Sequence, residues 1–448
     1  MQTILNLVKR HKEGAAIGLV SVCSAHPIVI EAAMRSAHHN GQAVLIEATS
    51  NQVNQDGGYT GMAPRDFHDF VMRIADEVGL PRDKVWLGGD HLGPNCWQGL
   101  RAEEAMARSA VMIDAYVAAG FRKIHLDCSM SCADDPVPLG EEASAERAAR
   151  LCAVAESAWH RVGGEAPVYV IGTEVPVPGG AHETLHELAV TTPVAARSTI
   201  LAHRKTFSQR GLDAAWPRVI ALVVQPGVEF DHRTVIDYRP VAAQGLSSYI
   251  HDDTSLVFEA HSTDYQTPAN LAALVRDHFA ILKVGPGLSF ALREALWALA
   301  DIETAWLGYD SSSRFKEVVL DVMKNNPAHW QKYYADPATQ GYDLQFSLSD
   351  RIRYYWTHPE IKAAQERMLA NLERNPPPLA LLSQYLPRQY DAIRSGCLSR
   401  APRDLLLHAV GVVIEQYRAA CDAPTPQVEG MAVFKGHEAR KDAHVSRR

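Results

Sequence analysis

The feature that most constrains this chain is a regular alternation of short apolar runs with longer segments of helical periodicity. The apolar runs are rich in β-branched residues, and each ends in a polar or Gly/Pro loop before the next helical segment begins. From these runs we predict eight strands, at residues 17–22, 43–47, 84–87, 123–127, 168–173, 219–224, 256–260 and 280–284.

The segments between these strands have the apolar spacing of amphipathic helices. Helices are expected at residues 27–39, 64–78, 102–119, 144–160 and 192–209, with 291–303 as the last helix of the pattern. Eight βα units in succession, without a reversed edge strand, favour the α/β class and a closed (β/α)8 TIM barrel over an open sheet. The segment 176–216 is long enough to hold an inserted loop, and long loops of this kind tend to build substrate sites.

The pattern changes in the last third of the chain, which is rich in Tyr, Trp, Arg and Pro. Helices are expected there at residues 313–325, 327–334, 350–357, 359–374 and 402–421. We predict a barrel over residues 1–303 that carries the active site, a helical extension over 304–434 packed on the barrel, and a mobile polar tail over 435–448. Residues 1–14 are expected to form a polar amphipathic helix.

Composition narrows the class of protein. An apolar content of 47% allows a large core, and a formal net charge of -8 without a Lys/Arg stripe argues against a nucleic-acid partner. No apolar run is long enough to span a bilayer, so no membrane partner is expected. The seven cysteines form no regular framework, which predicts reduced thiols in a cytoplasmic protein.

Side chains that can carry chemistry gather directly after the predicted strands. In a barrel these positions meet at one mouth, where active sites are built. In strand order they are Glu47 with Asn51, Asp90 with His91, Asp127 with Ser129, then Glu174, then Gln225 with Glu229, then Glu259, His261 and Asp264, and finally Lys283 with Gly285 and Gly287.

The pair Asp90 and His91 has two interpretations by itself, a helix cap with a partly buried histidine or a metal site. The other strand ends favour the metal, because crowded carboxylates at one rim repel unless a cation compensates them. A divalent metal bound by His91, His261 and a carboxylate satisfies this requirement, and His232 is a further possible ligand. His125 lies inside a strand, where alternation is expected to turn it away from the neighbours of Asp127, so we interpret it as structural.

The loop after the eighth strand is a candidate phosphate site. Gly285 and Gly287 precede a helix, and free amides at a helix start bind phosphate, although a simple Gly-Pro turn is the alternative. Arg351 and Arg353 diverge on a helix, so at most one of them is expected to point at the site. An ordinary amphipathic helix would also explain this segment.

Several long motifs resemble the tagatose-bisphosphate aldolase accessory subunit family. They are EATSNQVNQ (47–55), GYTGM (58–62), GDHLGPNCW (89–97), IGTEVPVPGG (171–180), EAHSTDYQ (259–266) and SLSDRIRYYW (347–356), and the resemblance covers residues 17–417. Members of this family are described as non-catalytic subunits, as tagatose-6-phosphate kinases or as fructose/tagatose 6-phosphate 4-epimerases, so the resemblance implies three functions.

A weaker resemblance is to the class II aldolases, which are zinc-dependent barrels. Asp90-His91, Asp127-Cys128-Ser129, His261-Ser262 and Lys283-Val284-Gly285 stand where those enzymes carry an Asp-His pair, an Asp-Gly-Ser triplet, a His-Gly-Ser loop and a Lys-Val-Asn triplet. Their middle zinc histidine, after the sixth strand, has no counterpart in residues 225–231. The resemblance therefore implies that Glu229 or His232 replaces it, and we assign Glu229.

Of the three functions, the kinase has least support, because the chain has no phosphate loop ending in Gly-Lys-Ser/Thr. A non-catalytic subunit that stabilises a class II tagatose-1,6-bisphosphate aldolase would explain the extension but not the charged rim. We therefore predict an isomerase that uses a divalent metal (Zn, Mn or Mg). It would invert C4 of a ketohexose 6-phosphate, D-tagatose 6-phosphate to D-fructose 6-phosphate, by a retro-aldol/aldol route in galactitol or tagatose catabolism.

Each candidate residue has an expected role in this reaction. Asp90, Glu174 and Asp127 are the catalytic candidates for proton transfer, and His91, Glu229 and His261 are the metal ligands. The substrate and phosphate contacts are assigned to Glu47, Asn51, Ser262, Asp264, Gly285, Gly287 and Arg351. The expected partners are a phosphorylated ketohexose and, through the extension, either a second copy or a class II aldolase.

Overall fold

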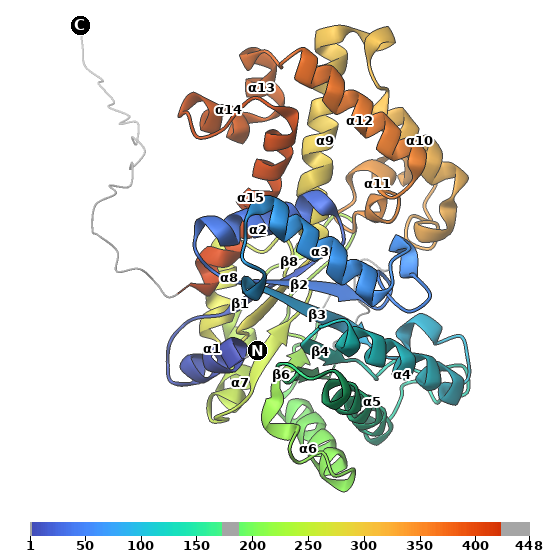
Figure 1. The fold of residues 1–448 in the computed structure, drawn as a ribbon, viewed down its shortest axis with the longest axis vertical. Coiled ribbons are helices and arrows are strands. Elements are labelled where there is room, and N and C mark those ends of the chain that lie inside the picture. The colour runs from blue at the N-terminus through green and yellow to red at the C-terminus, as the bar shows by residue number, and fades with distance from the viewer. Residues whose placement is uncertain (1, 173–187, 423–448) are drawn as a thin grey trace, which may run out of the picture.

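The computed structural model describes residues 2–172 and 188–422 (Figure 1). Eight parallel strands close into a barrel in the order β1-β2-β3-β4-β5-β6-β9-β10 and back to β1, which confirms the predicted (β/α)8 fold and its eight strands. The strands are β1 Leu19–Cys23, β2 Val44–Thr49, β3 Val85–Leu92, β4 Lys123–Leu126, β5 Val168–Ile171, β6 Val219–Val224, β9 Val257–Ala260 and β10 Ile281–Val284.

Helices surround the barrel, and many of them begin with proline. Proline suits the first helical position because its fixed φ matches the helix and its missing N–H would have no helical partner there. At α6 and α8 the preceding threonine completes the cap, since Thr192 and Thr267 accept backbone hydrogen bonds at 3.2 Å. These helices are α1 Gln2–Lys12, α2 Pro27–His39, α3 Pro64–Val78, α4 Ala102–Ala118, α5 Glu141–Val162, α6 Pro193–Gln209, α7 Pro240–His251, α8 Pro268–Arg276 and α9 Pro286–Leu307.

Strand β3 is longer than the sequence predicted, because it continues through both glycines to Leu92 instead of ending at Leu87. The glycines provide space. A Cβ at Gly88 would lie 2.4 Å from Oε1 of Glu47, and one at Gly89 would lie 2.4 Å from Cδ1 of Leu92. The strand pairing shifts register between Gly89 and Leu92, so the functional pair lies on an irregular strand end.

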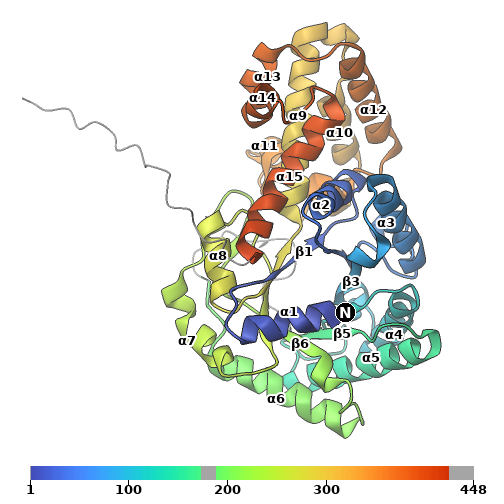
Figure 2. The same ribbon diagram turned by 60° about the vertical axis from the view of Figure 1, so that its left-hand side comes forward.

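Helix α1 covers the amino-terminal end of the barrel (Figure 2). Its Ile4 and Val8 are buried in a cluster with barrel residues such as Leu45, Val168 and Ile220. The opposite end, where the strands terminate, is therefore the open mouth.

The C-terminal helices form a lobe beside that mouth (Figures 1 and 2). Helix α9 runs from the barrel into the lobe and crosses the boundary predicted at residue 303, and that division stays a prediction. The lobe contains α10 Phe315–Asn325, α11 Gln340–Phe346, α12 Pro359–Arg374, α13 Leu379–Tyr385 and α14 Pro387–Arg394. The last helix, α15 Pro402–Cys421, returns to the barrel and packs on α2, α8, α9 and β1.

Two of the helices predicted in the lobe do not form, so these two predictions are wrong. Residues 327–334 contain only the 3₁₀ turn η6 Pro327–His329, and residues 350–357 contain only η7 Arg351–Tyr354. Asp350 has a φ of 43°, a left-handed conformation that does not continue a right-handed helix. In the described ranges no helix is long and apolar enough to cross a membrane. Residues 435–448, predicted as the tail, lie outside the described residues.

Three histidines connect α1 to the closed end of the barrel. Nε2 of His11 lies 2.9 Å from Nδ1 of His278, and Nδ1 of His251 lies 3.0 Å from Nε2 of His278. Burial, and then the charges of His11 and Lys12, lower the pKa of His278 to about 4. The folded state therefore favours the neutral ring.

This shift predicts a loss of stability in acid. A histidine in the unfolded chain titrates near pH 6.5. Neutral His278 therefore contributes fully to the free energy of unfolding above that pH, and this contribution decreases as the pH falls toward about 4. In urea denaturation, His278→Asn should lose less unfolding free energy than the wild type between these pH values. The exposed control His160→Asn should show the same pH dependence of unfolding free energy as the wild type. If His278→Asn also shows the wild-type pH dependence, His278 is not the group that destabilises the fold in acid.

Candidate active site

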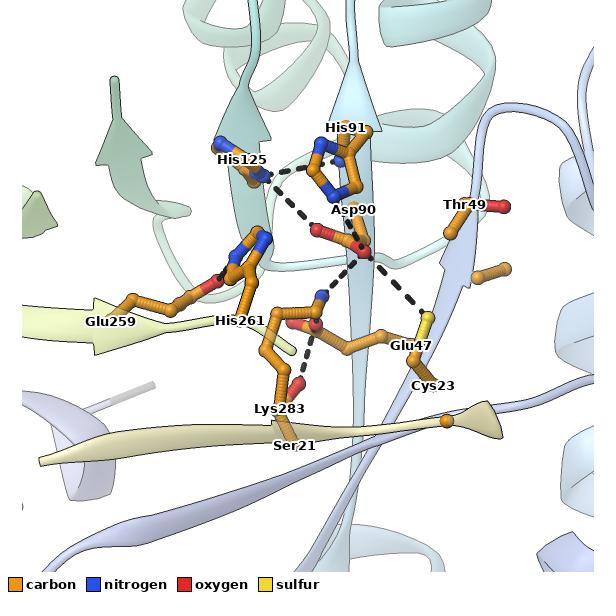
Figure 3. Close-up of polar contacts among 12 residues, drawn as sticks. Ser21, Cys23, Glu47, Thr49, Asp90, His91, His125, Glu259, His261 and Lys283 are labelled. Atoms are coloured by element: carbon orange, nitrogen blue, oxygen red, sulfur yellow. Dashed lines mark hydrogen bonds and ion pairs between the residues drawn. The ribbon is translucent and has the colours of Figure 1, made fainter. Parts of the chain in front are cut away.

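A buried ion network occupies the barrel just below its mouth (Figure 3). Nζ of Lys123 lies 2.7 Å from both Glu47 Oε1 and Glu259 Oε2. Nζ of Lys283 lies 2.7 Å from Glu47 Oε2 and 2.5 Å from Asp90 Oδ2. The network links β2, β3, β4, β9 and β10, so it holds side chains from five strands in one layer.

The network carries more negative than positive charge. Burial opposes ionisation, but Lys123 and Lys283 lower the pKa of Glu47, while Asp90 and Glu47 raise the pKa of Lys283 well above its usual value. Asp127 is also ionised: burial opposes its charge, but its hydrogen bonds with His91 and Ser129 and the charges of His91 and His125 together lower its pKa to about 2. The four buried carboxylates thus outnumber the two ammonium groups by two. Burial opposes a charge on His125, but Asp90 raises its pKa, so His125 offsets part of this excess and a divalent cation would compensate the rest.

Three imidazoles converge above this network around Asp90. The ring centroid of His91 lies 4.8 Å from that of His261 and 4.9 Å from that of His125. Ligand atoms of Asp90, His91, His125 and His261 all lie within 4.8 Å of one another. Imidazole and carboxylate donors in such a group are typical of sites for divalent transition metals.

Each imidazole is oriented by a second polar group, which for His125 is the carbonyl oxygen of Gly172, 2.9 Å from Nε2. Nδ1 of His91 lies 2.7 Å from Asp127 Oδ2, and Nε2 of His261 lies 3.0 Å from Glu259 Oε1. Metal-binding histidines commonly have such a carboxylate on their other ring nitrogen. Burial lowers the pKa of His261 to about 3, so this ring is neutral and can offer a lone pair.

The backbone is strained at two of the strand ends that build the cluster. His91 has a φ of 47° and Ser262 a φ of 51°, in the left-handed region that is unusual for residues with a side chain. Strain of this kind persists only where the surroundings enforce it, and it is concentrated at functional sites.

The cluster opens into a cavity of about 560 Å³ between the barrel mouth and the lobe. The barrel wall includes Cys23, Asp90, His91, His261 and Lys283, and the lobe wall includes Arg353, Tyr354, Trp356, Lys362 and Arg403. Barrel and extension therefore enclose one site.

The structure brings together Asp90, His91 and His261, as the strand ends suggested. The interpretation of His125 as turned away is wrong, because its Nδ1 lies 3.0 Å from Asp90 Oδ1. Residues two apart on a strand share a face, so Lys123, His125 and Asp127 all project into the barrel. This spacing was the signal that could have found both His125 and Lys123.

The region after the sixth strand does not contribute to the cluster. Glu229 lies on β7 (Glu229–Phe230, paired with β8 Val235–Ile236), where its Oε1 accepts a 2.9 Å hydrogen bond from Phe230 N. Burial raises its pKa to about 7. His232 instead has its Nδ1 3.1 Å from Ser349 Oγ. The ligand assignment of Glu229 thus has no support in the geometry.

Two predicted contact residues lie beneath the cavity instead of on its wall. Asp127 orients His91, and Glu47 is fully buried between Lys123 and Lys283. Neither carboxylate lines the cavity, so the assignments of Asp127 to proton transfer and Glu47 to substrate are corrected to supporting roles. Glu174 lies outside the described residues.

The predicted phosphate amides already have an internal partner. Oδ1 of Asp264 accepts hydrogen bonds from Gly285 N at 3.0 Å and from Gly287 N at 2.7 Å. Because Asp264 already pairs with these amides, they are not free for a phosphate here, although Gly285 lines the cavity; the predicted role of both glycines stays a prediction. Asn51, Ser262 and Asp264 do line the cavity.

Of the two arginines in η7, the one that lines the cavity is Arg353 and not Arg351. Arg351 lies with its guanidinium 3.6 Å from the ring centroid of Tyr333 and 4.4 Å from that of Tyr354, and its Nε donates to His329 O at 2.7 Å. Side chains two residues apart on a 3₁₀ helix point to different sides of it. Arg351 and Arg353 therefore cannot both face the cavity.

These features define a (β/α)8 barrel protein with a candidate active site at the carboxyl ends of its strands. Residues 4–422 match the family of D-tagatose-1,6-bisphosphate aldolase subunit GatZ/KbaZ-like proteins. The chain belongs to this family, and the membership predicted from the motifs is confirmed.

Solved structures include one of high similarity and others of low similarity. The structure of a probable tagatose 6 phosphate kinase from Sinorhizobium meliloti 1021 is 50% identical, with a TM-score of 0.83 over 90% of this chain and 100% of that chain. The YdjI aldolase from Escherichia coli K12 is 12% identical, with a TM-score of 0.40 over 82% and 95% of the two chains. A fructose-bisphosphate aldolase from Campylobacter jejuni is 14% identical, with a TM-score of 0.40 over 84% and 92%.

The network predicts a large effect of a single buried charge. Lys123→Met leaves Glu47 and Glu259 without their shared cation, and removing one partner of a buried ion pair costs about 3–5 kcal/mol of unfolding free energy. Chemical denaturation at pH 7 measures this loss. The exposed control Lys324→Met should change stability by less than about 0.5 kcal/mol. A loss for Lys123→Met as small as that of the control would contradict the structural role.

Proposed function

We propose that this protein is a metal-dependent isomerase that inverts C4 of a ketohexose 6-phosphate, converting D-tagatose 6-phosphate into D-fructose 6-phosphate. The observation that carries the proposal is the cluster of Asp90, His91, His125 and His261, which lies at the mouth of the barrel and opens into a cavity of about 560 Å³. Cavities of about 300–1,000 Å³ are typical of small-molecule sites.

The residues of the cluster fit a divalent cation in donor type, spacing and charge. We assign His91, His125 and His261 to the cation, and among the three expected metals imidazole ligands suit Zn better than Mn or Mg. When bound, the cation supplies a fixed positive charge next to the carbonyl group of the sugar. The excess of buried carboxylates beneath the cluster favours such a charge.

The position of C4 determines the type of chemistry. In a 2-ketose C4 is not adjacent to the carbonyl, so removal of its C–H proton is not assisted by that group. Retro-aldol cleavage avoids this difficulty: the C4 hydroxyl loses its proton, the C3–C4 bond breaks, and its electron pair is delocalised onto the C2 carbonyl. The new aldehyde turns, the bond re-forms on its opposite face, and the proton returns to the C4 oxygen.

Asp90 is the residue that we assign to this proton. It lines the cavity, and its Oδ2 lies 2.5 Å from Lys283 Nζ. Burial opposes its charge, but His91 and Lys283 hold its pKa well below the usual value, so the carboxylate is ionised and has a free lone pair for the proton. Asp127 acts as a positioning residue, since it contacts the ring of His91 and not the cavity.

A second candidate function is the stabilisation of a class II tagatose-1,6-bisphosphate aldolase. The observation that favours it is that the lobe and the end of α9 leave several large apolar side chains exposed. They are Trp306, Tyr309, Tyr342, Phe346, Leu379 and Tyr385.

One assay separates the two functions. The purified chain, supplied with Zn, Mn or Mg, should form D-fructose 6-phosphate from D-tagatose 6-phosphate without another protein, as measured by NMR or a coupled enzyme. A chelator should abolish turnover, and the metal should restore it. If no product forms, and the chain only increases the activity of a separate aldolase, the accessory function replaces the proposal.

Two variants test the assigned roles. His261→Ala removes an assigned ligand, so metal binding measured by calorimetry and turnover should both be lost. Asp90→Asn keeps the imidazoles but removes the base, so metal should remain bound while kcat falls by about 10²–10⁴-fold. Loss of the metal from Asp90→Asn would show instead that Asp90 is a ligand.

A further inference from the structure

Arg353 is a half-buried guanidinium on the lobe wall of the cavity. Its NH1 donates to the carbonyl oxygens of Ser349 and, at 3.2 Å, of Asp350, and its NH2 donates to the hydroxyl of Tyr354 at 3.4 Å. No carboxylate of the described residues forms an ion pair with Arg353 within 4.0 Å. Burial opposes its charge, but Tyr354, Tyr59 and then Asp350 raise the pKa of Arg353, so its own segment stabilises the cation in part. An anionic ligand in the cavity would complete this compensation.

The positive charges of the neighbouring arginines have carboxylate or aromatic partners within the protein. Arg293 has its Nε 3.8 Å from Asp350 Oδ1, and Arg403 forms an ion pair with Glu31. Arg351 is enclosed by the rings of Tyr333 and Tyr354. The positive charge of Arg353 is therefore the one directed toward a ligand on this wall.

Two further groups on the same wall suit an anion. Lys362 on α12 lines the cavity and has no ion pair among the described residues. Trp356 is 5% exposed, lines the cavity, and its Nε1 has no hydrogen-bond partner in the described part of the chain. Burial first, and then the charges of Lys362 and Arg403, lower the pKa of His26 on the facing barrel wall to about 3.

The floor and the lobe wall of the cavity therefore differ in the charged groups that they carry. The floor holds the carboxylate excess and the imidazole cluster, and the lobe wall holds the guanidinium of Arg353, the ammonium of Lys362, an indole N–H and one carboxylate, that of Glu366. The amides of Gly285 and Gly287, where a barrel commonly binds phosphate, are occupied by Asp264.

We propose that Arg353, with Lys362 and the indole N–H of Trp356, binds the phosphate group of a sugar phosphate whose carbonyl end lies over the histidine cluster. The sugar in this statement rests on the proposed function, whereas the phosphate rests on the lobe wall alone. A guanidinium can donate two parallel hydrogen bonds to one phosphate, which a lysine cannot. The C-terminal extension therefore supplies substrate specificity to the barrel.

The test compares binding of three ligands by isothermal titration calorimetry: D-tagatose 6-phosphate, D-tagatose and inorganic phosphate. The metal-loaded wild type should prefer the sugar phosphate, and inorganic phosphate should compete with it. Arg353→Met should weaken sugar-phosphate binding by about 30-fold or more, the usual result of truncating one partner of a buried charge pair, and leave D-tagatose binding unchanged.

Three further variants complete the test. Lys362→Met should show a smaller loss in the same direction, and Arg367→Met, on the same helix but outside the cavity wall, should match the wild type. Arg353→Lys should lose about 10-fold, because it keeps the charge without the second hydrogen bond. Circular dichroism checks the fold of each variant, and Arg353→Lys carries the test if Arg353→Met does not fold.

The outcomes distinguish this inference from the proposed function. An Arg353→Met protein that keeps the wild-type preference for the phosphorylated sugar overturns the phosphate site, even if the wild type is an active epimerase. A wild type without turnover that still binds the phosphorylated sugar through Arg353 overturns the epimerase and retains the phosphate site. A wild type without any preference for the phosphorylated sugar also overturns the inference.

Discussion

The ammonium group of Lys123, shared by Glu47 and Glu259 inside the barrel, is the contact on which the mouth of this protein depends. Each carboxylate uses its second oxygen to position another group, since Glu259 reaches His261 and Glu47 reaches Lys283. Lys283 in turn contacts Asp90. One buried cation therefore positions an imidazole and a carboxylate on different strands, and the site above it is organised before any ligand arrives.

Space inside the barrel is as important as charge. The carboxylate of Glu47 fits only because Gly88 on the neighbouring strand has no side chain, and the strained backbone at His91 turns that ring toward the centre of the mouth. A barrel filled with apolar side chains would have a stable core but no room for this layer. The polar layer shows that the upper interior of the barrel is built for chemistry more than for packing.

The extension is part of the site and not an appendage to it. Helix α9 carries the chain from the barrel into the lobe, and α15 returns it to the outside of the barrel. Helix α9 also contacts the short segment that contains Arg353, since Ser289 Oγ donates to Asp350 Oδ2 at 2.6 Å. Opposite walls of one cavity then differ in charge, which suits a ligand with a carbonyl at one end and a phosphate at the other.

The sequence by itself determined the barrel, the strand order and the rim, because apolar periodicity and strand ends are local properties. It also contained the signal for His125, because residues two apart on a strand, such as His125 and Asp127, have their side chains on the same face. Only the tertiary structure decided that Glu229 leaves the cluster, that Asp264 occupies the amides of Gly285 and Gly287, and that Arg353 faces the cavity in place of Arg351. These outcomes depend on which groups from distant segments meet and pair, and a linear pattern of residues does not encode that directly.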